Sequence, residues 1–217
     1  LLANGSRPFV PPIQGAERAG VFTLRTLADA LEIQEYARRV DQVIVIGGGV
    51  LGLEAGRGLA KLGPKVTIVE FFPRLMPRQL DVPGARVLQK QIEALGMQVV
   101  LDAATETVLG DGRPTGIRLK DGREFGGQMV LISAGIRSNA GLAQEAGIQT
   151  NRAVVVDRAM HTNAPDVWAA GDVAEFEGRT WGIVTAATEQ ARVAAANMAA
   201  APGETPATYT EIVPSNT

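Results

Sequence analysis

The chain has 217 residues, 46% of them hydrophobic, and its 21 basic and 23 acidic residues give a formal net charge of −2. This length suits one large domain or parts of two, and the near balance of charge argues against a surface that binds nucleic acid. The lack of cysteine excludes disulfides, thiolate metal sites and a redox-active cysteine pair from this sequence. No apolar run approaches the roughly 18 residues of a membrane span, and without a visible signal peptide a cytoplasmic location is expected.

The first forty residues predict a short strand, an extended connection and a helix. Residues 1–5 read as the end of a strand, and residues 7–15, RPFVPPIQG, read as a proline-rich extended connection. Residues 26–40 have helical periodicity, with Leu27 and Leu31 on one side. This helix leads into the most informative part of the chain.

Residues 43–70 have the pattern of a complete nucleotide-binding unit, VIVIGGGVLGLEAGRGLAKLGPKVTIVE. The opening β-branched run predicts a buried strand, and a Gly-x-Gly-x-x-Gly motif follows it. Residues 50–62 then predict a helix and residues 65–69 a second strand. Glu70 ends the second strand, near the spacing of about 20 residues after Gly47 at which an acid reaches an adenosine ribose.

Each residue type in this unit has a chemical reason. Gly47 allows a tight strand-to-helix turn, Gly49 lets the backbone approach a pyrophosphate without a Cβ in the way, and Gly52 lets the helix pack close to the strand. The start of the helix presents unpaired N–H groups and about half a positive charge to the phosphates. Glu70 can accept hydrogen bonds from both ribose hydroxyls and would repel a 2′-phosphate, which favours NAD(H) over NADP(H).

Two alternatives stay open for this unit. A glycine-rich turn can occur in an α/β domain that binds no ligand, although strand, glycines, helix, strand and acid in this order argue against that interpretation. Arg74 and Arg78 lie just beyond Glu70, and arginines there could hold the extra phosphate of NADP(H).

Residues 81–133 predict the remainder of this domain. A helix at 81–95 is followed by a strand at 97–101, and a buried strand returns at 128–133. Between these strands, Asp-Gly turns indicate an antiparallel meander. The meander strands are expected at 105–109, 116–120 and 123–125. The whole pattern is that of a doubly wound domain over 43–133 in which a β-meander serves as one crossover.

The last part of the chain predicts further elements and a second site. The elements are a short helix at 140–146, strands at 153–156 and 167–170, and an alanine-rich helix at 185–200. Gly171 and Asp172 follow the second of these strands, at the kind of edge where open α/β sheets bind ligands. The Asp172 carboxylate could accept sugar hydroxyls and the Val173 amide could bind a phosphate, but a Gly-Asp turn alone is weak evidence.

Taken together, these motifs resemble those of the two-dinucleotide flavoprotein reductases, the pyridine nucleotide–disulfide oxidoreductase superfamily, over essentially the whole chain. LLANGSRP resembles the strand and turn that close the first half of the FAD domain, VIVIGGGVLGLE the NAD fingerprint, SAGIRSN the return crossover, and DVWAAGDVAEF the segment whose aspartate holds FAD. VEFFPRLMPRQLD is most similar to the flavin domain of assimilatory nitrite reductase large subunits, with rubredoxin reductases and NADH oxidases close behind. Asn4 and Ser138 stand where threonine and proline are usual, and neither change removes a ligand charge.

The resemblance implies an α/β fold in which a Rossmann-like NAD(H) domain, a parallel sheet with a β-meander crossover, is inserted in part of a second, FAD-binding α/β domain. It places the end of the first FAD segment at 1–32, the NAD(H) domain at 33–151, the second FAD segment at 152–206 and the start of an interface domain at 207–217. Both ends look cut, and the glycine-rich turn that binds the ADP half of FAD is missing. A fragment that holds FAD poorly and catalyses nothing alone is therefore expected.

The resemblance also assigns cofactor sites. Glu54 would lie near the nicotinamide, or would serve only as an acid in the first turn of a helix, where it favours the dipole. Gly135 would pass beside the cofactor, Asp172 would bind FAD, and residues 185–188 would start the helix that points at the flavin ring. The residues expected to bind a cofactor are Gly47, Gly48, Gly49, Val50, Leu51, Gly52, Glu54, Glu70, Phe71, Arg78, Gly135, Gly171, Asp172 and Ala187. No catalytic side chain and no metal ligand is expected.

The function implied by the resemblance is that of a reductase that passes hydride from NADH to FAD and electrons on to an acceptor. A downstream sirohaem and iron–sulfur module that reduces nitrite is favoured as the acceptor, ahead of an iron–sulfur protein or oxygen, and a homodimer is possible. A NAD(H)-binding redox-sensing or interaction module with little turnover is the alternative. A dehydrogenase with NAD alone fits worst, because no substrate acid or base is found within the nucleotide unit.

Overall fold

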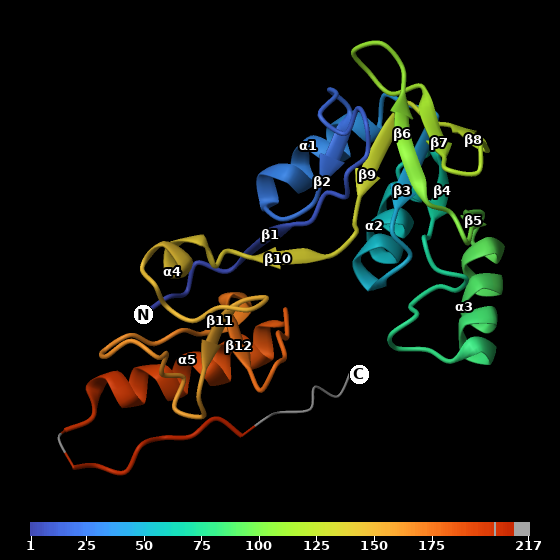
Figure 1. Cartoon of the computed structure of the whole chain (residues 1–217). Helices are drawn as coiled ribbons and strands as arrows, with labels where there is room; N and C mark the ends of the chain where they lie inside the picture. The colour runs from blue at the N-terminus through green and yellow to red at the C-terminus, as the bar shows by residue number, and fades with distance from the viewer. Residues whose placement is uncertain (202, 211–217) are drawn as a thin grey trace. The chain divides into compact units, whose positions relative to one another are not determined.

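The computed structural model describes residues 1–201 and 203–210 (Figure 1). The chain divides into two compact units. The inserted unit comprises residues 8–135, and the flanking unit comprises residues 1–7 together with the described residues from 136 onward. Each unit is described by itself.

A five-stranded parallel sheet in the order β2-β9-β3-β4-β5 lies at the centre of the inserted unit (Figure 1). The strands are β2 (Val21–Thr23), β3 (Gln42–Ile46), β4 (Lys65–Val69), β5 (Gln98–Val100) and β9 (Met129–Ile132). The central strands are fully or almost fully buried, as their continuous β-branched and aliphatic runs predict for a sheet covered on both faces.

Helices cover one face of this sheet, and a β-meander covers the other. The helices are α1 (Leu27–Ala37), α2 (Val50–Ala60) and α3 (Val82–Ala94), and the meander strands are β6 (Thr105–Leu109), β7 (Gly116–Leu119) and β8 (Glu124–Gly126). Side chains alternate along β3, so Val43 and Val45 belong to the core beneath the helices, whereas Ile44 and Ile46 belong to the core beneath the meander. The sheet is thus the middle layer of a three-layer unit.

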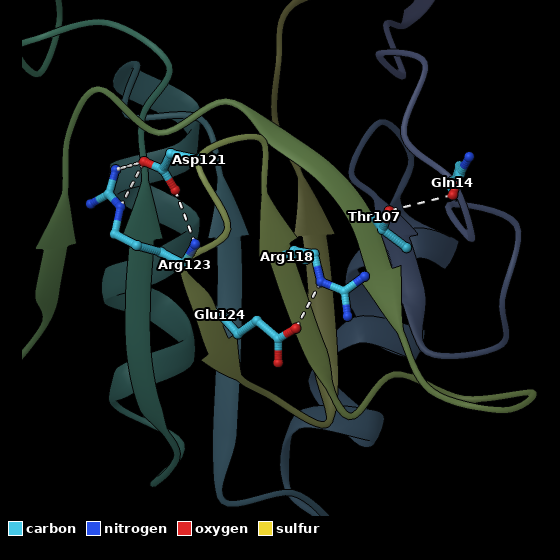
Figure 2. A network of polar contacts seen from close by, with 6 residues as sticks. All are labelled: Gln14, Thr107, Arg118, Asp121, Arg123 and Glu124. Atoms are coloured by element: carbon cyan, nitrogen blue, oxygen red, sulfur yellow. Dashed lines mark hydrogen bonds and ion pairs between the residues drawn. The ribbon is translucent and has the colours of Figure 1, made fainter.

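Polar contacts fix the outer face of the meander (Figure 2). Arg118 of β7 pairs with Glu124 of β8 at 2.7 Å, and Arg123 pairs with Asp121 at 2.7 Å across the Asp-Gly turn. The Arg123 guanidinium also donates to the Asp102 carbonyl oxygen at 3.1 Å. These pairs are about half exposed and therefore screened by solvent, so they add little to stability.

The flanking unit has short strands and one long helix. Its elements are β1 (Ser6–Pro8), β10 (Ile136–Ser138), α4 (Gly141–Glu145), β11 (Val154–Val156), the 3₁₀ turn η1 (Gly171–Val173), β12 (Ala174–Phe176) and α5 (Val184–Ala199). β1 pairs with β10, and β11 pairs in parallel with β12. The core of this unit contains Val154, Val173, Phe176 and Tyr209, and the Tyr209 ring meets the Phe176 ring edge-to-face at 5.4 Å.

The compact units divide the chain at places other than the predicted domain boundaries of 33 and 151. β2 pairs with β9 in the central sheet, so residues 8–32 belong with the inserted unit rather than with the first FAD segment. Residues 136–151 belong with the flanking unit. Tyr209, in the segment predicted to open an interface domain, is buried in the flanking core, and residues 211–217 of that segment lie outside the described residues.

The strand predicted at 167–170 is also wrong in its extent. This segment makes only isolated bridges, from Trp168 to His161 and from Ala169 to Leu2, and the regular strand of the region is β12. Trp168 and Ala169 are bridged to different segments of the chain, so too few consecutive residues share one partner strand to form a regular ladder.

Candidate dinucleotide-binding site

The turn between β3 and α2 requires glycine at two of its three motif positions for reasons of packing. Gly47 has a φ of +122°, and a Cβ there would lie 2.2 Å from the Ser133 carbonyl oxygen. A Cβ on Gly52 would lie 2.0 Å from the Gly47 carbonyl oxygen. Both distances are far inside van der Waals contact, so the helix can approach the turn only because these residues lack side chains.

Gly49 differs, because a Cβ there would meet no atom within 4 Å. Its φ of −81° is open to any residue, so neither packing nor backbone conformation requires glycine at this position. Gly49 is also the N-cap of α2 and makes no side-chain cap, whereas α1 and α3 are capped by Thr26 and Asp81. The open space and the uncapped helix start are the features that a pyrophosphate needs.

Gly48 connects the turn to the acid and to the loop that follows β4. Its N–H donates to Glu70 Oε2 at 2.6 Å, and its carbonyl oxygen accepts from the Met76 N–H at 3.0 Å. A Cβ on Gly48 would lie 2.6 Å from Leu75 Cδ2, so the loop packs directly on the glycine. Gly48 was predicted as a cofactor ligand, but its backbone groups already have partners within the protein.

Glu70 is held at the end of β4 with only 6% of its surface exposed. Besides the bond from Gly48, its Oε1 accepts from the Phe72 N–H at 2.9 Å. An ionised carboxylate has about four acceptor sites, so two remain for other donors. The structure therefore fixes an acceptor beside the glycine turn, as the spacing in the sequence predicts.

Some side chains that follow Glu70 are exposed to solvent, whereas Arg74 is hydrogen-bonded within its own loop. Phe71 and Phe72 are 64% and 47% exposed, and Arg78 is exposed as well. Arg74 instead donates from Nη2 to the Pro77 carbonyl oxygen at 2.9 Å and from Nε to the Leu80 carbonyl oxygen at 3.3 Å. Arg74 thus closes its own loop, which argues against its use as a ligand of a 2′-phosphate.

Glu54 and Gly135 complete the predicted positions in this unit. Glu54 is exposed on α2, and because the helix begins at Val50, Glu54 lies beyond the first turn. The interpretation of Glu54 as a first-turn acid that favours the helix dipole is therefore wrong. Gly135 has a φ of +101° and open space where a Cβ would stand.

The flanking unit contains the second predicted site, at Gly171 and Asp172. Ser6 Oγ donates to Asp172 Oδ2 at 2.7 Å, and Ser138 Oγ donates to the Asp172 carbonyl oxygen at 2.6 Å. The Gly171 N–H donates to Oε1 of Gln190, which is 1% exposed. Three side chains from β1, β10 and α5 thus hold the Gly171–Asp172 turn.

The start of α5 lies beside this turn. Its N-cap, Ile183, makes no side-chain cap, and a Cβ on Gly171 would lie 3.5 Å from the Ala187 Cβ. Ser6 and Gln190 were not predicted as site residues, because their partners lie far along the chain and no local pattern marks them. The structure places Ala187 beside the Gly171–Asp172 turn.

The described residues contain neither a cluster of metal ligands nor a helix suited to crossing a membrane. Over 1–201 and 203–210, no group of three or more acidic, His or Cys side chains is placed to hold a metal ion. Within the same residues, no helix combines the length and the apolar character that crossing a membrane requires.

Comparison with known proteins identifies the family. A family model described as pyridine nucleotide-disulphide oxidoreductase matches residues 1–197, and the chain belongs to this family. Its members bind FAD and a pyridine nucleotide, which agrees with the fold and cofactor classes that the resemblance implied.

Individual relatives are similar over most of the chain. A nitrite reductase [NAD(P)H] from Bacillus subtilis is 41% identical over 91% of this chain and 25% of its own length. An NADH oxidase from Methanocaldococcus jannaschii is 35% identical over 92% of this chain and 46% of its own length. The crystal structure of a ferredoxin reductase from Rhodopseudomonas palustris superimposes with a TM-score of 0.88, at 28% identity, over 96% of this chain and 53% of its own. The chain therefore spans about a quarter to a half of these relatives.

Proposed function

We propose that the inserted unit is the NAD(H)-binding part of a flavoprotein reductase. The observation that carries this proposal is the Glu70 carboxylate, held by the Gly48 and Phe72 amides directly beside a glycine turn with an open position at Gly49. An acid fixed there accepts ribose hydroxyls and disfavours a 2′-phosphate, which supports NADH over NADPH. Gly47 and Gly52 allow the turn, and the uncapped start of α2 binds the pyrophosphate.

The flanking unit would supply part of the FAD site. The turn at Gly171 and Asp172 is fixed by Ser6, Ser138 and Gln190, so its carboxylate and amides are oriented before a ligand binds. The uncapped start of α5 adds N–H groups and a positive dipole end beside the turn. When both groups are bound, NADH supplies a hydride and the flavin accepts it, and the protein contributes binding and orientation.

The electron acceptor belongs to the whole protein rather than to these two units. The relatives are named nitrite reductase, NADH oxidase and ferredoxin reductase, so reductases built on this fold differ in what they reduce. The 41% identity to the nitrite reductase supports a nitrite-reducing module as the acceptor. An iron–sulfur protein is the next candidate, by similarity to the ferredoxin reductase.

The test is a calorimetric titration of the 217-residue chain with NADH and with NADPH. Saturable binding of NADH, at least about 10-fold tighter than binding of NADPH, is the expected result, because a charged acceptor bond to the ribose contributes about 1.5–3 kcal/mol. Glu70→Gln should remove most of this preference. Glu17→Gln, which neutralises an exposed acid elsewhere in the same unit, should leave the preference unchanged.

If a folded sample of the whole chain, shown by circular dichroism, binds neither dinucleotide, the proposed NAD(H) site is wrong. If Glu70→Gln binds both dinucleotides as the unsubstituted chain does, Glu70 does not decide between them.

A further inference from the structure

The inserted unit has a hollow of about 340 Å³ between α3 and the loop that follows β4. Two arginines and a glutamine line it together with an apolar wall, and none of the described residues that line it is acidic. The apolar wall consists of Pro73, Val82, Ala85 and Leu101. A pocket of this size, with an apolar wall and few polar groups, is typical of a small-molecule site.

Arg74 is the fixed polar group of this hollow. Its Nε donates to the Leu80 carbonyl oxygen at 3.3 Å, and its Nη2 donates to the Pro77 carbonyl oxygen at 2.9 Å. A guanidinium has more N–H groups than these two bonds use, so some remain for another acceptor. Because the loop already orients this guanidinium, an anion that binds it has little order to impose.

Arg86 adds a second positive charge from α3. It is exposed, and within residues 1–201 and 203–210 its guanidinium has no hydrogen-bond or ion-pair partner. Asp81, the acid that precedes the helix, accepts the Gly84 N–H at 2.8 Å as the N-cap of α3. Two guanidinium groups with no acid among the lining residues favour a carboxylate or a phosphate, whose oxygens match the planar fork of arginine.

We propose that this hollow is a second small-molecule site, which takes a small anion with an apolar body, such as an aryl carboxylate or an aryl phosphate ester. Arg74 and Arg86 bind the anionic group, and the apolar wall packs against the body. The residues of the glycine turn, Glu70 and Phe71 are not among those that line the hollow, so the site is separate from the dinucleotide site. This inference goes beyond the proposed function and does not require that the chain bind NAD(H).

The experiment titrates the 217-residue chain by calorimetry with two aromatic anions, benzoate and phenyl phosphate. Each is compared with the ion that lacks the ring, acetate or inorganic phosphate. At least one aromatic anion should bind saturably and roughly 10-fold or more tighter than its ring-free counterpart, because only the ring reaches the apolar wall. The tighter of the two shows which anionic group the arginines prefer. If neither aromatic anion binds, or if the ring gives no gain in affinity, the proposal is overturned.

Variants on α3 locate the site. Arg86→Gln removes a charge from the hollow and should weaken the aromatic anion by roughly 10-fold or more. Val82→Asp places a negative charge in the wall and should abolish binding, while the fold is kept because an acid at the first position of a helix favours the dipole. Lys90→Gln and Val87→Asp make the same changes at exposed positions of α3 that do not line the hollow, and affinity should stay within about 3-fold.

The outcomes of these variants and of a competition experiment decide the proposal. If Arg86→Gln and Val82→Asp bind the aromatic anion as their controls do, the hollow is not the site. The titration is repeated with saturating NADH, and an unchanged affinity supports a separate site. Competition between the two ligands places the anion at the dinucleotide site and overturns the inference. If NADH does not bind at all, the proposed function fails, and the variants alone decide whether the hollow binds anions. Thermal unfolding of each variant checks that a loss of affinity is not a loss of fold.

Discussion

Among single residues, the glycines of the motif have different structural roles, and mutation can test this difference. Gly52→Ala places a Cβ 2.0 Å from the Gly47 carbonyl oxygen, whereas Gly49→Ala meets no atom within 4 Å. Gly52→Ala should therefore lower the free energy of unfolding by about 1–3 kcal/mol or prevent folding. Gly49→Ala should change stability by less than about 1 kcal/mol, because a lost glycine cap and a stiffer unfolded chain oppose each other.

The affinity for NADH should be lowered by Gly49→Ala, the variant whose stability is expected to change little. Gly49→Ala should weaken NADH by roughly 10-fold or more, because its methyl group occupies the path of the pyrophosphate. Urea unfolding and calorimetry on the same samples make the comparison. A Gly49→Ala protein that binds NADH normally would show that the phosphates do not approach the turn at this residue.

Single residues also show which features of the site could be predicted from the sequence and which could not. Glu70 and the turn glycines could be predicted because their spacing follows from one strand-turn-helix-strand unit. The commitment of Gly48 to Glu70 and Met76 could not be predicted, because any residue of the motif offers the same backbone groups. Gln190 was missed for a related reason: a buried glutamine on an alanine-rich helix has no signature until its partner, the Gly171 amide, is known.

At the scale of elements, α1 begins with a capping box whose effect depends on pH. Thr26 Oγ1 accepts from the Asp29 N–H, and Asp29 Oδ2 accepts from the Thr26 and Arg25 amides at 2.8 Å. These backbone hydrogen bonds, from Thr26 first and then Arg25, hold the pKa of Asp29 below its ordinary value of 3.8. Because the folded-state pKa is the lower one, the carboxylate stabilises the fold above the unfolded pKa, and this stabilisation is lost as the pH falls through the folded pKa.

Asp29→Asn should accordingly lower the melting temperature at neutral pH. The difference from the unsubstituted chain should narrow as the pH falls below about 4, because the carboxylate of the unsubstituted chain then becomes protonated. Differential scanning calorimetry across this range is the measurement, with Glu32→Gln on the same helix as the control for a change in charge. A difference that stays constant down to acid pH would mean that Asp29 acts through shape rather than charge.

Elements also differ in how far local sequence determines them. The long helices, the central strands and the meander follow from periodicity and Asp-Gly turns, and all of them lie close to their predicted positions. β1, β2, β10 and β12 have three residues each, and none was predicted. β2 becomes a strand by pairing with β9, more than a hundred residues further along the chain, and such pairing leaves no local pattern to read.

At the scale of the molecule, the inserted unit has what an independent domain needs. Its five-stranded sheet is covered on both faces by separate apolar cores, and the glycine turn and Glu70 both lie within residues 8–135. Residues 8–135 should therefore fold alone, with a single cooperative urea transition, and bind NADH within about 3-fold of the affinity of the whole chain.

The same division predicts that FAD binding depends on the flanking unit. Asp172, Ser6 and Gln190 all lie outside residues 8–135, so the excised unit should bind no FAD. The whole chain should bind FAD only weakly, because the one Gly-x-Gly-x-x-Gly turn in this sequence is assigned to NAD(H). Flavin fluorescence, measured while FAD is titrated with the excised unit and with the whole chain, distinguishes no binding from weak binding. NADH affinity that is lost on excision, although the excised unit unfolds cooperatively, would show that the flanking unit completes the NAD(H) site and that the two cofactor sites are not separable.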